Sequence, residues 1–116
     1  MGHFLSSENI NHLIVLVFEN IKSIREQYNS IDNFLNCFYL KSIKKQGTVI
    51  TINLSSKNNG DNSVKDESYL GSFWLVCKQN IMDVTIYGNN SEIYIEISII
   101  KGNIKKINFK KCDIKT

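Results

Sequence analysis

The chain changes its hydrophobic pattern near Gly47. Before this glycine, apolar residues recur at spacings of three and four, which is the period of a helix with one buried stripe. After it, apolar and polar residues alternate, which is the period of a half-buried strand. This order predicts an α+β fold: an N-terminal helix and a short second helix packed on one face of an antiparallel sheet.

The first helix is predicted over residues 7–28. Ser6 or Ser7 can cap its start, and Glu8 lies favourably at the positive end of the helix dipole. The apolar stripe that should face the sheet comprises Ile10, Leu13, Ile14, Val17, Ile21, Ile24 and Tyr28.

A second, shorter helix is predicted over residues 30–39, with Ser30 as its cap and Asp32 in its first turn. Its end is ambiguous. Residues 41–46 can continue the helix and residues 37–43 can be extended; we prefer a helix that ends near Tyr39.

The sheet is predicted over residues 47–112 as about five strands, mostly a meander. The expected strands are residues 50–55, 69–78, 81–88, 91–100 and 104–112. The polar segment 55–68 is predicted to be a mobile loop. The whole chain, residues 1–116, is expected to form a single domain.

Turns restrict the strand register, because cross-strand partners must share a face. Two-residue turns at 79–80 and 89–90 and a three-residue loop at 101–103 align apolar residues with apolar residues. The face predicted to form the core comprises Phe73, Leu75, Cys77, Met82, Val84, Ile86, Ile93, Ile95, Ile97, Ile107 and Phe109.

The opposite face gathers aromatic and charged residues. In the predicted register, Trp74, Thr85, Tyr94 and Lys110 form one row across the sheet, and Tyr87 shares the next row with Glu92. The candidate partner-binding residues are Trp74, Tyr87, Tyr94, Asp83, Glu92, Glu96 and Lys110, because Trp and Tyr dominate interface energetics. Two alternatives stay open: the aromatics pack under another element, or the face is solvated without a role.

The charge of the chain is uneven. The net charge is +3, whereas residues 101–116 alone carry six lysines against Asp113, a local balance of +5. A basic terminal strand can contact phosphates, and it can equally protect an edge strand from aggregation. The chain contains no Pro or Ala and is rich in Ile, Asn and Lys, which indicates a gene from an AT-rich genome.

Several classes of protein are disfavoured. The longest apolar run, residues 13–18, is too short to cross a membrane. Three widely spaced cysteines without a C-x-x-C pair favour a reducing cytoplasm. No catalytic triad, phosphate loop or zinc pattern is recognisable, so we expect no enzyme, no cofactor and no metal.

In profile, this small, AT-biased helix-and-meander chain without a catalytic motif is similar to immunity proteins that are paired with bacterial toxins, and to phage-borne inhibitors. The resemblance implies a bacterial, cytoplasmic inhibitor whose partner is a cognate toxin or enzyme domain. One alternative is a small nucleic-acid-binding domain that uses the basic C-terminal strand. A second is a ligand-binding or enzymatic α+β cup.

Overall fold

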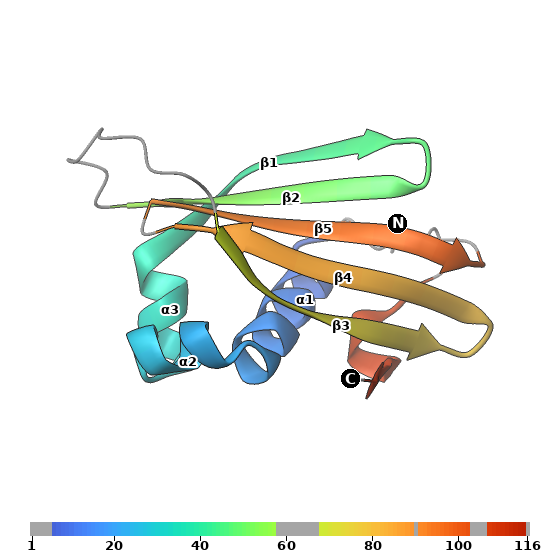
Figure 1. The fold of residues 1–116 in the computed structure, drawn as a ribbon, viewed down its shortest axis with the longest axis horizontal. Helices are drawn as coiled ribbons and strands as arrows, with labels where there is room; N and C mark the ends of the chain where they lie inside the picture. Colours follow the sequence, from blue (N-terminus) through green and yellow to red (C-terminus); the bar gives the residue numbers. More distant parts are fainter. Residues whose placement is uncertain (1–5, 58–67, 90, 103–106, 116) are drawn as a thin grey trace.

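A computed structural model of the chain describes residues 6–57, 68–89, 91–102 and 107–115. These residues form three helices on one face of a six-stranded antiparallel sheet, so the predicted α+β class is confirmed (Figure 1). The helices are α1 (Ser7–Asn20), α2 (Lys22–Tyr28) and α3 (Ile31–Cys37). The strands are β1 (Phe38–Gln46), β2 (Val49–Ser56), β3 (Ser68–Cys77), β4 (Asn80–Gly88), β5 (Glu92–Lys101) and β6 (Asp113–Lys115), with a short 3-10 helix, η2 (Phe109–Lys111), before β6.

The single helix predicted over residues 7–28 is broken at Ile21, which has extended backbone angles (φ −109°, ψ 105°). Ile21 is buried over Gly71 of β3, where an added Cβ would lie 2.9 Å from the Cδ1 atom of Ile21. The helix therefore breaks at the residue that contacts β3. The periodicity of the apolar residues does not reveal this contact.

Both predicted caps are present, but the second helix is shorter than predicted. The hydroxyl oxygens of Ser6 and Ser30 accept hydrogen bonds from the backbone N–H groups of Asn9 (3.2 Å) and Asn33 (3.1 Å). Helix α3 ends at Cys37, and the chain continues as β1. The extended alternative was correct for this segment, because residues 38–46 gain a backbone ladder along β2.

The predicted meander of β3, β4 and β5 is confirmed, but both hairpins pair two residues away from the predicted register. Phe73 lies opposite Val84, and Ile86 lies opposite Ile95. Lys78, with φ +57°, forms part of the first turn. A shift of two residues keeps every side chain on its face, so the hydrophobic pattern cannot detect it. All eleven predicted core residues are buried.

The strand predicted over residues 104–112 is wrong in its described part. Strand β2 occupies the place beside β5, and the sheet order is β1-β2-β5-β4-β3-β6. Residues 107–111 instead pack against α1. The buried side chain of Asn9 donates to the carbonyl of Ile107 (3.0 Å) and accepts from the N–H of Phe109 (2.8 Å). Among the described residues from 107 to 115, residues 113–115 form a strand, which pairs with β3.

Both ends of the segment predicted as a mobile loop, residues 55–68, belong to strands instead: Ser55 and Ser56 to β2, and Ser68 to β3. Residues 58–67 lie outside the described residues. Within the described helices there is no stretch of the length and hydropathy that a membrane crossing requires.

A disulfide joins Cys77, at the end of β3, to Cys112, just before β6, while Cys37 remains a thiol. The Cα atoms of the pair lie 4.4 Å apart, although 35 positions separate the residues in sequence. The spacing of the cysteines gave no sign of this pair, because the strand predicted over residues 104–112 was placed beside β5 instead of β3.

Candidate partner-binding face

The predicted site lies on the face of the sheet that points away from the three helices (Figure 1). Alternate residues of each strand point to this outer face, and in the described part of the chain no helix covers it. The observed register decides which of the predicted site residues lie together on this face.

Three tyrosines form one row across the outer face. Tyr69 of β3 lies opposite Tyr87 of β4, and Tyr87 lies opposite Tyr94 of β5. The rings of Tyr69 and Tyr87 meet edge to face, with centroids 6.2 Å apart and an interplanar angle of 69°. The Tyr69 hydroxyl lies 2.9 Å from the hydroxyl of Ser72. The row therefore places three tyrosines at neighbouring positions on three strands.

Tyr69 was missed by the sequence prediction. A β-bulge between Tyr69 and Gly71 changes the register at the start of β3. With Tyr69 at 62% exposure, the tyrosine row has an accessible end. The glycine at position 71 was the signal in the sequence, since glycine within a strand often marks a bulge; in the structure it has a positive φ of 154°.

Trp74 does not share a row with Tyr94, contrary to the prediction. It lies between Asp83 of β4 and Lys115 of β6. Because Asp83 and Tyr87 are four residues apart on β4, the Trp74 row is about 13 Å from the tyrosine row. Trp74 is 44% exposed, so it is not part of a second core layer.

Two of the predicted acidic residues, Asp83 and Glu96, lie on the outer face close to the aromatic rows. Asp83 lies opposite Trp74, and Glu96 lies opposite Thr85 in the row between Trp74 and the tyrosines. Both carboxylates are half-buried. The two residues lie in different rows, because Asp83 pairs with Ser98 of β5 and Glu96 pairs with Thr85 of β4.

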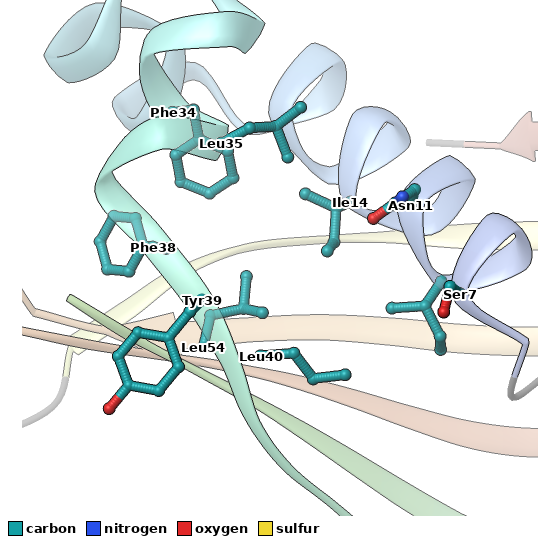
Figure 2. Close-up of a pocket in the computed structure, with 10 residues that line it drawn as sticks. Ser7, Asn11, Ile14, Phe34, Leu35, Phe38, Tyr39, Leu40 and Leu54 are labelled. Carbon is teal, nitrogen blue, oxygen red and sulfur yellow. The ribbon is translucent and has the colours of Figure 1, made fainter. Parts of the chain in front are cut away.

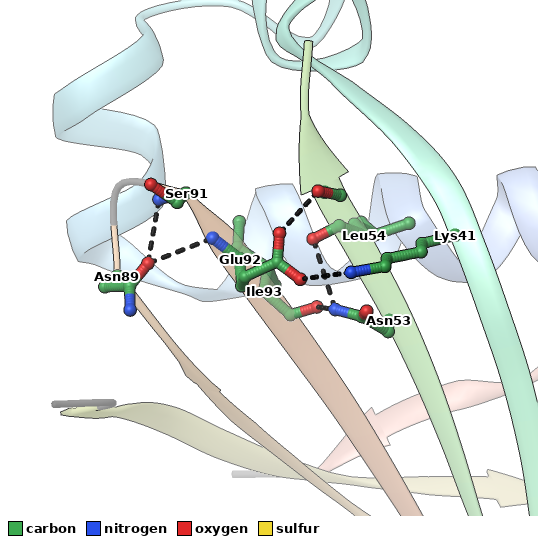
Figure 3. A network of polar contacts seen from close by, with 8 residues as sticks. Lys41, Asn53, Leu54, Asn89, Ser91, Glu92 and Ile93 are labelled. Atoms are coloured by element: carbon green, nitrogen blue, oxygen red, sulfur yellow. Dashed lines mark hydrogen bonds and ion pairs between the residues drawn. The ribbon is translucent and has the colours of Figure 1, made fainter. Parts of the chain in front are cut away.

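Glu92 belongs to a polar network at one end of β5 (Figure 3). Its carboxylate accepts a hydrogen bond from Ser55 and lies 3.6 Å from the ammonium nitrogen of Lys41. Its backbone N–H donates to the side chain of Asn89 (3.0 Å). These contacts tie β1, β2 and β5 together, so the structure gives Glu92 a role in holding three strands.

The same network includes a buried amide. The side chain of Asn53 donates to the carbonyl of Ile93 (3.3 Å) and, more weakly, to that of Leu54 (3.4 Å) (Figure 3). Asn53 lies beside Tyr94 in the tyrosine row. The row therefore ends in a polar, hydrogen-bonded position of β2.

Lys110 is not on the outer face. It lies in η2, whose first residue, Phe109, is buried against α1 on the helix side of the sheet. The predicted basic strand is likewise not formed by the described residues 107–112. Lys110 and Lys111 lie in η2 and Lys115 lies in β6, whereas Lys105 and Lys106 lie outside the described residues.

A groove of about 420 Å³ lies on the helix side of the sheet, between α1, α3 and β1 (Figure 2). Its lining is mostly apolar and consists of Ser7, Ile10, Asn11, Ile14, Phe34, Leu35, Phe38, Tyr39, Leu40 and Leu54. These residues include no carboxylate, imidazole or thiol, so they offer no acid–base pair to an enzymatic cup. Among the described residues there is also no cluster of His, Cys, Asp and Glu that would hold a metal.

An aromatic cluster supports the wall of this groove. Tyr28 packs edge to face on Phe38, with ring centroids 5.5 Å apart, and against Phe34 at 5.2 Å. Burial raises the pKa of Tyr28, and the electrostatic effect of the nearby Cys37 side chain raises that pKa further. The tyrosine is therefore held in its neutral form as a packing residue.

The chain matches no protein-family model, no curated protein and no solved structure.

Proposed function

We propose that this protein is an inhibitor that binds another protein through its outer sheet face, and that it acts as an immunity protein against a cognate bacterial toxin. The observation that supports this proposal best is the accessible row of Tyr69, Tyr87 and Tyr94, with Trp74 44% exposed on the same face. Exposed Tyr and Trp side chains are the residues that most often carry binding energy at interfaces.

The charges on this face suggest the character of the partner. Asp83 and Glu96 lie between and beside the aromatic rows, so a complementary surface would present basic side chains around an apolar centre. The chain as a whole is net basic at +3. Lys115 also lies beside Trp74, so the acidic contacts to a basic toxin would come from Asp83 and Glu96 and not from the overall charge of the chain.

The proposed compartment is the cytoplasm of the cell that makes the toxin. In that reducing compartment Cys77 and Cys112 would be thiols. The pairing of β3 with β6 and the buried side chain of Phe109 would then hold the C-terminal segment in place.

The test uses the product of the gene adjacent to the one that encodes this chain. That product is expressed alone and together with the chain, and growth of the host is measured. We expect the adjacent product to arrest growth and the chain to restore it. Titration of the two purified proteins then gives the dissociation constant for the variants.

We expect Trp74→Ala and Tyr87→Ala each to weaken binding by roughly 30-fold or more, which corresponds to about 2 kcal/mol. Ile100→Ala is the matched control, because Ile100 is an exposed apolar residue, 56% accessible, at the far end of β5. Circular dichroism shows that each variant is folded. If all three variants bind the partner protein with equal affinity, the partner does not bind at the outer face as proposed.

The nucleic-acid alternative predicts the opposite ranking. Lys110→Glu and Lys111→Glu would then weaken binding to a DNA or RNA duplex, and the affinity would fall steeply with salt. Under the inhibitor proposal, these two substitutions leave the affinity for the partner protein within about twofold, because η2 lies on the other side of the sheet.

A further inference from the structure

A second surface, separate from the aromatic face, lies along β1. This strand is at the edge of the sheet and pairs only with β2 among the described strands. Residues 42–46 form an unbroken antiparallel ladder with residues 53–49 of β2. On the other side of β1, alternate backbone N–H and C=O groups therefore point away from the sheet, where a further strand can pair.

The groove described above lies beneath this edge (Figure 2). Leu40 of β1 is 45% exposed, although Leu54, its partner on β2, is only 2% exposed. Leu35, at 37% exposure, lies on the opposite wall. Alternate side chains of an added strand would point towards the helices. Apolar side chains at these positions would cover Leu40.

The charges on β1 distinguish between possible occupants. Lys41, Lys44 and Lys45 are exposed, and β1 contains no acidic residue. A second copy of the chain, paired through β1, would place these lysines close to the same lysines of its partner, and like charges across strands are destabilising. An acidic strand would instead meet opposite charges.

We propose that β1 is a docking edge for an extended segment of a partner protein that alternates apolar and acidic residues. The segment adds as a seventh strand next to residues 42–46, with its apolar side chains over Leu40 and its carboxylates near Lys44. The backbone supplies hydrogen bonds, and the groove and lysines supply selectivity. This proposal is independent of the aromatic face and of the inhibitor role.

The test uses a synthetic ten-residue peptide of alternating Glu and Val, acetylated and amidated, titrated into the full chain at low salt. Two control peptides replace every Glu by Lys, or every second Val by Pro. We expect saturable binding of the Glu-Val peptide that is at least tenfold tighter than that of either control. Amide hydrogen exchange within residues 42–46 should slow at least tenfold on binding.

Variants locate the site. Leu40→Gln and Lys44→Glu should each weaken binding of the Glu-Val peptide at least tenfold. Ile100→Gln and Lys110→Glu are the matched controls, since both residues are exposed and lie away from β1; they should change the affinity less than twofold. Circular dichroism confirms that the variants are folded.

Four results would overturn the proposal. The first is that the Glu-Val peptide shows no saturable binding, and the second is that the Lys-Val peptide binds equally well. The third is that hydrogen exchange in β1 does not change when the peptide is bound. The fourth is that Leu40→Gln and Lys44→Glu do not change the affinity for the peptide. A fifth contrary result would come from sedimentation of the chain without peptide. If the chain forms a dimer, and Lys44→Glu changes the dissociation constant of that dimer, then a second copy of the chain binds along β1.

Discussion

The Cδ1 atom of Ile21 lies over Gly71, at a distance that leaves no room for a Cβ atom: an ideal Cβ on Gly71 would be 2.9 Å away. Ile21 is the residue at which the first helix breaks, and Gly71 is at the bulge of β3. The two irregularities therefore meet, and each accommodates the other.

We expect Gly71→Ala to lower the free energy of unfolding by about 1–3 kcal/mol, because Gly71 has φ +154°, a conformation that residues with a Cβ rarely adopt, and because the new methyl group crowds the Cδ1 atom of Ile21. In an Ile21→Val background, which lacks the Cδ1 atom, the cost of Gly71→Ala should be smaller by at least about 0.5 kcal/mol. Urea denaturation of the four proteins measures this coupling. Equal costs in both backgrounds would show that the contact does not matter.

The two faces of the sheet should differ sharply in their sensitivity to substitution. Ile95 is completely buried, so Ile95→Ala should cost about 2–5 kcal/mol. Val84→Asp should prevent folding, because it buries a charge without a partner. Trp74→Ala should cost no more than about 1 kcal/mol, since Trp74 is 44% exposed. Thermal melts that rank Trp74→Ala with Ile95→Ala would place Trp74 in a core.

The side chain of Asn9 should stabilise the packing of the C-terminal segment on α1. Asn9→Ala removes both hydrogen bonds to the buried backbone of Ile107 and Phe109 and should cost about 1–3 kcal/mol. Asn9→Asp keeps an acceptor for Phe109 but turns an oxygen towards the carbonyl of Ile107, so it should be destabilising at pH 7. Asn11→Ala, an exposed position on the same helix, is the control in urea denaturation. Equal midpoints for Asn9→Ala and Asn11→Ala would contradict this assignment.

The disulfide between Cys77 and Cys112 closes a loop of 35 positions. Chain entropy then gives a stabilisation of about 2–4 kcal/mol in the oxidised protein. Reduction, or Cys77→Ser with Cys112→Ser, should lower the urea midpoint accordingly. Cys37→Ser should not, because Cys37 is a thiol outside the pair. A midpoint that is insensitive to reduction would show that the disulfide adds no stability.

The sequence alone determined which face of the sheet each core residue occupies. Alternation along a strand is a local property, so Phe73, Val84 and Ile95 were assigned correctly even though their partners were not. The helix caps at Ser6 and Ser30 were also predictable, because a cap hydroxyl bonds to a backbone N–H three residues away.

Only the tertiary structure decided which strands are neighbours and how the candidate site is composed. A shift of two residues preserves every face, so the pattern could not show that Tyr87 lies beside Tyr94 or that Trp74 lies about 13 Å from their row. The pairing of β5 with β2, the strand β1 and the break at Ile21 each depend on contacts between distant segments. Such contacts leave no periodic trace in the sequence, because their energy comes from residues that are neighbours in space alone.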